Sequence, residues 1–207
     1  MTQRNRLVRM ALAGMVVVGA VVLAGCGAGG SGGSGRRVSG TRSYVGTAQG
    51  TGALVAVVVD GSRVLAYVCD GVPSDSGGTA PALQTWFNGT SDGRVVDVQQ
   101  PAGRLELRLA GATMNGTVTL ADGRKLRVAG EPVSGDAGLY RAEVAAGGGT
   151  RVAGWILAPD GRQRGGFGDG ATLSGVRTLT LTQPTFTLQG LASARISKVG
   201  ITPIPIP

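Results

Sequence analysis

Alternation of apolar and polar side chains is the clearest pattern in this chain of 207 residues. Residues 104–109 place Leu105, Leu107 and Leu109 on one face of an extended segment and charged side chains on the other. Residues 117–120 and 178–181 repeat the pattern with threonine in the polar positions. A period of two is typical of antiparallel strands that bury one face and leave the other in water, so we expect sheets.

Aspartate–glycine pairs separate several of these segments. Asp60-Gly61, Asp92-Gly93, Asp122-Gly123 and Asp160-Gly161 each stand between two apolar or alternating runs. Glycine accepts the positive φ that a tight hairpin turn requires, so we expect a hairpin at each pair. About ten strands follow from these signals, near residues 53–59, 63–70, 83–89, 94–99, 104–110, 115–121, 124–129, 138–145, 150–158 and 176–188.

Many short sequential strands, with no convincing amphipathic helix beside them, predict an all-β domain over residues 44–190. We expect a single antiparallel up-and-down meander closed into a barrel, because closure removes exposed edges. A two-sheet sandwich is the alternative. Residues 191–207 are expected to form a Pro-rich tail. Residues 201–207 alternate proline with other residues, mostly isoleucine, and therefore form neither a helix nor a central strand.

The first 25 residues have a different composition from the rest. Three arginines precede an apolar run over residues 10–22, which is shorter than the roughly 20 residues of a membrane-spanning helix. Leu23-Ala24-Gly25-Cys26 follows, and residues 26–43 then form a tether rich in Gly and Ser. This arrangement resembles the signal peptide of a bacterial lipoprotein. The resemblance implies cleavage after residue 25 and acylation of the thiol and new amino group of Cys26; an uncleaved transmembrane anchor is the alternative.

Acylation of Cys26 would attach the domain to the extracytoplasmic face of the cell membrane. Removal of the leader leaves 182 residues with 17 basic and 12 acidic side chains, a net charge of +5 against +8 for the whole chain. These charges are scattered and aromatic residues are few, which argues against a nucleic-acid partner. The expected partner is the membrane, contacted through the N-terminal acyl chains, together with an unidentified protein or lipid.

Histidine is absent from the chain. This excludes Ser-His-Asp and Cys-His catalysis and metal sites with histidine ligands. Cys69 is the one cysteine after Cys26, so no internal disulfide is possible, and we expect it to be a small buried hydrophobe. We therefore expect no enzyme, no metal and no cofactor.

Several local motifs formally match functional signatures but fit loops or turns better. Residues 74–78 are similar to the nucleophile segment of chymotrypsin-like proteases, but without histidine they predict a polar loop. Asn88-Gly89 and Asn115-Gly116 begin formal glycosylation sequons and are interpreted as turns. The Gly-rich residues 165–170 predict a flexible loop. The remaining candidates are scattered aspartates that fit turns better than a cation site, namely Asp70, Asp75, Asp92, Asp97 and Asp169.

Aromatic side chains are few and lie within the expected strands. They are Tyr67, Trp86, Phe87, Tyr140 and Trp155. Core packing is the simpler interpretation of their positions. The alternative is that some of them line a cavity inside the barrel that holds an apolar ligand.

Four segments, residues 66–71, 86–90, 138–142 and 154–162, resemble an uncharacterised domain of actinobacterial secreted and membrane-anchored proteins. The resemblance covers about residues 44–168, implies an exported location and carries no activity. The leading hypothesis is a lipid-anchored, non-enzymatic domain that binds or scaffolds at the cell envelope. A carrier with a lipid or hydrophobic small molecule inside a lipocalin-like barrel is the second hypothesis. A hydrolase built from Asp, Glu, Arg, Ser or Tyr is the third.

Overall fold

Strands dominate the computed structural model, which describes residues 40–146, 149–168, 172–187 and 193–200. Strands make up 63% of the structure, and one 3-10 turn at Ser74–Ser76 is the one helical element of the described ranges. The prediction of an all-β fold is therefore confirmed. Within the same ranges, no helix is long and apolar enough to cross a membrane.

Eight antiparallel strands form the largest sheet, sheet A, in the order β4-β3-β2-β1-β8-β7-β6-β5. Their bounds are β1 (Thr41–Ala48), β2 (Leu54–Asp60), β3 (Arg63–Cys69), β4 (Gln84–Thr90), β5 (Val95–Gln100), β6 (Gly103–Ala110), β7 (Thr113–Leu120) and β8 (Lys125–Val133). Pairing of β1 with β8 joins two four-stranded meanders. The outer strands β4 and β5 meet at a single bridge between Ser91 and Val96, so the barrel is nearly closed.

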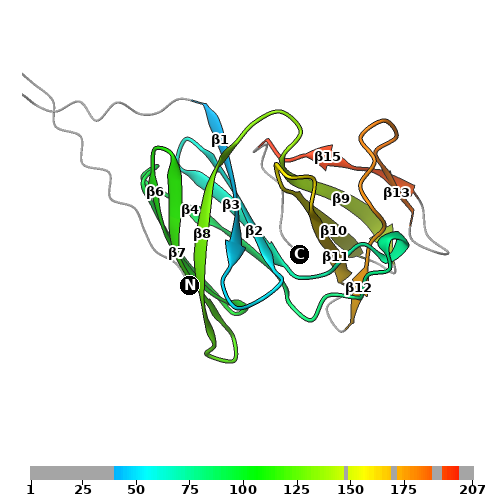
Figure 1. Cartoon of the computed structure of the whole chain (residues 1–207), viewed down its shortest axis with the longest axis horizontal. Helices are drawn as coiled ribbons and strands as arrows, with labels where there is room; N and C mark the ends of the chain where they lie inside the picture. Colours follow the sequence, from blue (N-terminus) through cyan, green and yellow to red (C-terminus); the bar gives the residue numbers. More distant parts are fainter. Residues whose placement is uncertain (1–39, 147–148, 169–171, 188–192, 201–207) are drawn as a thin grey trace, which may run out of the picture. The chain divides into compact units, whose positions relative to one another are not determined.

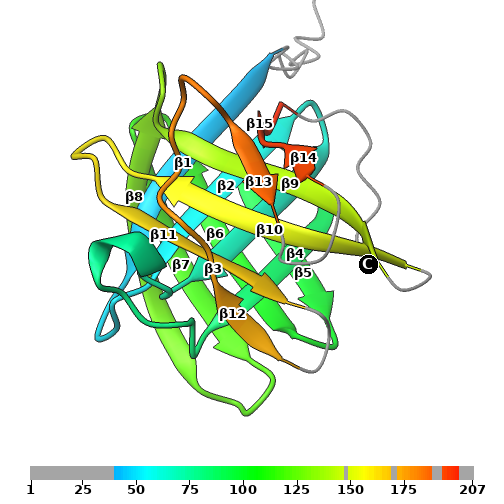
Figure 2. The ribbon, with the colours of Figure 1, turned by 90° about the vertical axis from the view of Figure 1, so that its right-hand side faces the viewer.

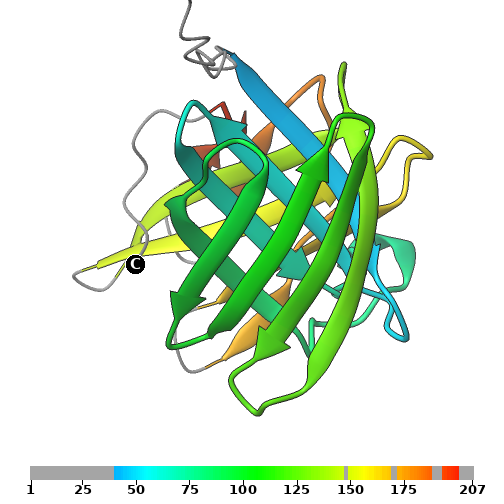
Figure 3. The same ribbon diagram turned by 90° about the vertical axis from the view of Figure 1, so that its left-hand side faces the viewer.

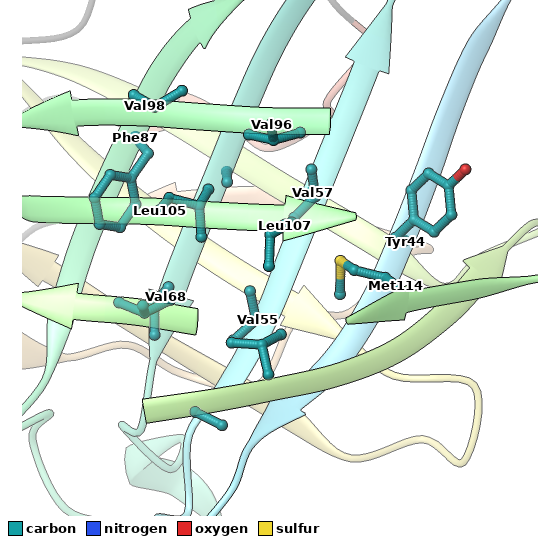
Figure 4. Packing of buried hydrophobic residues seen from close by; sticks show 14 of the residues in the cluster. Tyr44, Val55, Val57, Val68, Phe87, Val96, Val98, Leu105, Leu107 and Met114 are labelled. Carbon is teal, nitrogen blue, oxygen red and sulfur yellow. The ribbon is translucent and has the colours of Figure 1, made fainter. Parts of the chain in front are cut away.

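Alternating side chains fill the interior of this barrel. Leu105, Leu107 and Leu109 of β6 point inward and are at most 3% exposed, as the sequence pattern predicts. Phe87 and Met114 meet them from other strands (Figure 4). Inward residues pack in one cluster, so the transfer of apolar surface out of water holds the two meanders together.

A second sheet, sheet B, covers one side of the barrel (Figures 1 and 2). Its strands are β9 (Gly138–Ala146), β10 (Gly149–Leu157), β11 (Gln163–Gly168), β12 (Leu173–Gly175) and β15 (Ser197–Lys198), in the order β12-β11-β10-β9-β15. Leu139 and Ile156 pack against the outward side chains of β1 to β3. The apolar run of β2 is explained by burial on both faces.

A hairpin of β13 (Thr185–Thr187) and β14 (Ser193–Arg195) lies over the far face of sheet B. Its Phe186 contacts Trp155 and Phe167 from above, with ring centroids 5.4 and 5.7 Å away. The opposite side of the barrel, formed by β5 to β8, carries no other described element (Figure 3). The described chain therefore forms a nearly closed barrel of eight strands that further sheets flank on one side.

Two expected boundaries differ from the structure. β1 (Thr41–Ala48) starts before the expected domain boundary at residue 44 and precedes the first expected strand, near residues 53–59; β14 and β15 lie inside the expected tail of residues 191–207. Thr41 and its polar neighbours pair through their backbones with β2, which side-chain alternation does not reveal. Of the single strand expected near residues 176–188, the short strand β13 (Thr185–Thr187) forms, whereas the amide of Leu179 donates to the Gln163 side chain instead of to a strand.

The Asp–Gly pairs behave as predicted, whereas the Asn–Gly pairs do not. Gly61, Gly93, Gly123 and Gly161 all have positive φ, from 58 to 87°, in the expected turns. Gly89 and Gly116 instead lie inside β4 and β7, so the interpretation as turns is wrong there. A Cβ at Gly116 would lie 2.0 Å from the carbonyl oxygen of Glu106, so glycine is required for close strand approach.

Candidate functional site

The five aromatic residues lie in three different layers. Phe87 points into the barrel core. Tyr67 and Trp86 lie between the barrel and sheet B. Tyr140 and Trp155 lie on the far face of sheet B. The structure therefore does not bring all five into one site, although Tyr67 meets Trp86, and it places each of them in a packed cluster.

Tyr67 and Trp86 stack against the glycines of sheet B. Their ring centroids are 4.1 Å apart with planes inclined by 28°, and the Tyr67 hydroxyl donates to the Gly166 carbonyl at 3.4 Å. A Cβ at Gly154 would lie 2.6 Å from Trp86 and 2.8 Å from Tyr67. Gly165 and Gly166 belong to β11, so the prediction of a flexible loop is wrong for residues 165–168; residues 169 and 170 lie outside the described ranges.

Arg141 is a buried charge beside this aromatic pair. Its guanidinium lies 5.5 Å from the centroid of the Trp86 ring and 2.6 Å from the carboxylate of Glu143. Burial lowers the pKa of Arg141, and Glu143 opposes that shift. An arginine remains charged in such surroundings, so the group is a structural cation and not a proton donor.

Cys69 is fully buried, as expected, and its thiol is free. Burial raises the pKa of the thiol to about 11, and the Gly71 amide donates to the sulfur at 3.4 Å. A protonated thiol is a poor nucleophile. This residue therefore contributes packing rather than chemistry.

The described aspartates among the sequence candidates form hydrogen bonds or ion pairs with other residues of the chain. Asp70 accepts hydrogen bonds from the amides of Ala82 and Leu83. Asp75 accepts from the amide and hydroxyl of Thr178, and these bonds lower its pKa. Asp92 caps its turn and Asp97 pairs with Arg104. No group of three metal-ligating side chains exists in the described residues, and Asp169, like Cys26, lies outside them.

An outer groove hollows the described surface, and sequence reasoning did not identify it. It runs between the outward side of β1 and β8 and the turn that joins β10 to β11. One half has a volume of about 440 Å³ and includes Thr47 and Thr113. The other has about 610 Å³ and includes Ser134 and Asp136. Both halves share Glu131, Ala158 and Pro159, so they are continuous.

A glycine pair forms the floor of the groove. Gly46 of β1 lies opposite Gly130 of β8. A Cβ at Gly46 would lie 2.3 Å from the Ala129 carbonyl oxygen, and one at Gly130 would lie 2.6 Å from that of Val45. A Cβ at Gly130 would also lie 2.7 Å from Met114 Cε in the barrel core, so the missing side chains are on the inward face and glycine allows β1 and β8 to approach closely there.

The groove is acidic in a basic protein. Its charged residues are Glu131, Asp136, Asp160 and Arg162. Arg162 is bound to Asp160 at 2.6 Å. The Arg162 backbone amide, and then its guanidinium, hold the pKa of Asp160 below its usual value. Two further carboxylates, on Glu131 and Asp136, therefore leave a net negative lining that favours a cationic ligand.

Comparison with known proteins gave no match to a family model, a curated protein or a solved structure. The groove and the packing around it are therefore the basis for a functional proposal.

Proposed function

We propose that the chain is a lipid-anchored, non-enzymatic protein of the cell envelope that holds a cationic, extended protein segment in the outer groove. The anchor rests on the Leu23-Ala24-Gly25-Cys26 sequence and the Gly/Ser-rich tether behind it. Acyl chains at Cys26 would keep the domain at the extracytoplasmic face.

The observation that carries the binding role is the acidic lining of the groove. Glu131 lies where its two halves meet, with Asp136 and Asp160 towards opposite ends. An elongated hollow with carboxylates along its length suits a chain with spaced Lys or Arg side chains better than a compact small molecule.

Packing within the barrel supports a ligand on the outside rather than a carrier. Tyr44, Phe87, Leu105, Leu107 and Met114 are each at most 1% exposed and meet in the interior (Figure 4). A carrier that holds a lipid in its barrel requires that volume for its ligand.

Photo-crosslinking in whole cells tests both parts of the proposal. A photoreactive phenylalanine analogue replaces Thr113, which lines the groove, or Thr119, which lies on the same strand outside it, in the full-length chain. Each variant is made with Cys26 intact and with Cys26→Ser, and cells are labelled with palmitate. We expect palmitate only with Cys26 intact, and a membrane-bound protein adduct from Thr113 but not from Thr119.

Glu131→Gln in the Thr113 variant should reduce the adduct several-fold, because one of the three carboxylates is neutralised. Equal adducts from both positions would contradict the groove assignment. Palmitate incorporation into the Cys26→Ser chain would contradict the anchor assignment.

A further inference from the structure

The outer side of strands β5 to β8 is a broad face of the barrel that no other described element covers (Figure 3). Apolar residues such as Leu107, Met114 and Val118 point from these strands into the core, so the residues between them point to solvent. Polar and charged side chains occupy most of the outward positions. This face is therefore open to a partner that forms hydrogen bonds or ion pairs.

Strand register places cations beside the outward side chains of β7. Three successive outward residues of β7 each lie directly opposite a basic residue of β6 or β8, and we call these pairs the cationic rows. They are Asn115 with Arg108, Thr117 with Arg127, and Thr119 with Lys125. Side chains directly opposite each other are about 5 Å apart, and successive rows are about 7 Å apart along β7. Each row therefore combines a positive charge with an uncharged hydrogen-bonding group.

The cations of the rows have no carboxylate partner among the described residues. The acidic side chains of the same face are bound to other groups. Both carboxylate oxygens of Asp97 accept hydrogen bonds from Arg104, which also lies 3.3 Å from Glu106. Asp122 pairs with Arg124 in the turn between β7 and β8 at 2.6 Å. The positive charge of the rows is therefore not neutralised within the described chain.

Two shallow hollows open onto the cationic rows. One has a volume of about 440 Å³ and includes Arg108, Asn115 and Thr117. The other has about 320 Å³ and includes Thr119 and Lys125. Both hollows share Glu106, so they adjoin each other. A phosphate group that enters either hollow meets a cation and an uncharged donor together, which favours charge-assisted hydrogen bonds.

The rest of the described surface offers no comparable array of cations. Arg42 and Arg164 donate to backbone carbonyls, and Arg162 and Arg177 pair with aspartates. Glu131, which lies beyond the rows on β8, belongs to the acidic outer groove. An anionic partner is therefore expected at the rows rather than on another described face.

We propose that the cationic rows bind the phosphate headgroups of anionic lipids in the membrane to which Cys26 attaches the chain. This inference rests on the anchor of the proposed function. Residues 27–39 separate Cys26 from the first described residue, Gly40, so the length of chain keeps the domain within about 50 Å of the bilayer. Tethering gives the headgroups a high effective concentration at this face. Each Lys or Arg near an anionic bilayer strengthens binding roughly fivefold.

Fluorescence quenching in vesicles tests this inference. A fluorescent amino acid replaces Ala110, which is exposed on the same face but outside the rows, or Thr185 of β13, which is exposed beyond sheet B. Full-length chain isolated from cells is reconstituted into phosphatidylcholine vesicles that carry a headgroup-linked quencher, with or without about 30% phosphatidylglycerol. With phosphatidylglycerol, quenching at Ala110 should exceed that at Thr185 at least about threefold, and about 0.5 M salt should remove the excess.

Two variants of equal net charge show whether the rows cause this excess. The test variant neutralises the cations of the rows, by Arg108→Gln, Lys125→Gln and Arg127→Gln. The control variant removes cations from β3, β10 and β14, by Arg63→Gln, Arg151→Gln and Arg195→Gln. We expect the test variant to lose the excess quenching and the control variant to keep it.

Flotation of the same vesicles separates this inference from the anchor. Failure of the chain to float with pure phosphatidylcholine vesicles would overturn the anchor and, with it, this inference. Flotation with a probe at Ala110 that is quenched no more than the one at Thr185 would overturn the inference alone. Equal loss of quenching in the two variants would also overturn it, because net charge rather than the rows would then control the contact.

Discussion

At the residue scale, burial rather than reactivity determines the role of Cys69. The residue was expected to pack as a small hydrophobe, and the structure confirms that it is fully buried. Its neighbour Tyr67 is buried as well, and desolvation raises the pKa of the phenol well above its usual value. Both groups are therefore neutral in the folded protein over the ordinary pH range.

The pH dependence of stability should reveal this thiol. Its pKa in the fold is about 11, against 9.0 without burial. Between these values the unfolded chain loses a proton that the folded chain keeps, so stability that is complete below pH 9 falls as pH rises towards 11. The two units correspond to about 3 kcal/mol.

Cys69→Ala should flatten that part of the profile and cost roughly 1 kcal/mol at pH 7 for a methyl-sized cavity. Urea unfolding at several pH values measures both effects. Rapid labelling of Cys69 itself, as distinct from Cys26, by iodoacetamide in the folded wild type at pH 8 would contradict the assignment.

At the element scale, β10 requires glycine at the position where side chains of the barrel contact its backbone. Gly154 faces the Tyr67–Trp86 stack, whereas Gly149 of the same strand has no atom within 4 Å of a built Cβ. The two positions are therefore a matched pair in one strand. They separate the effect of interlayer contact from the general effect of glycine in a sheet.

Gly154→Ala should lower the free energy of unfolding by about 1–3 kcal/mol, because the added methyl group would overlap the buried rings of Tyr67 and Trp86. Gly149→Ala should leave stability equal or raise it by about 0.4–1 kcal/mol, since alanine restricts the unfolded chain. Urea denaturation of both variants tests the difference. A larger loss at Gly149 would show that contact with the rings does not control this strand.

At the scale of the whole molecule, the layers share strands and should unfold together. β1 to β3 contribute to the barrel core with one face and to the cluster under sheet B with the other. Sheet B likewise packs on its far face against Phe186. A layer cannot separate without exposing a buried apolar face of its neighbour, which favours one cooperative transition.

The two tryptophans report on different layers and test this expectation. Trp86 lies between the barrel and sheet B, and Trp155 of β10 lies on the far face of sheet B. In Trp86→Phe and in Trp155→Phe, the fluorescence of the remaining tryptophan should follow the same urea transition as far-UV circular dichroism. Separate midpoints within one variant would show that sheet B unfolds independently of the barrel.

Local chemistry determined the strand positions and the class of fold. The alternation in β6 and the positive φ at the Asp–Gly turns are properties of a few neighbouring residues, so the sequence alone predicts them. Apolar runs such as β2 and β10 also indicate strands. A run that is apolar on both faces does not show which layer each face meets.

Tertiary structure decided which distant residues meet. The five aromatics were predicted as core or cavity residues, and only packing places them in three separate layers. The outer groove is lined by both β1 and β8, whose pairing no local pattern encodes. Register between strands so far apart in sequence is set by the burial of whole faces, and this is the physical reason that the site could not be predicted from the chain alone.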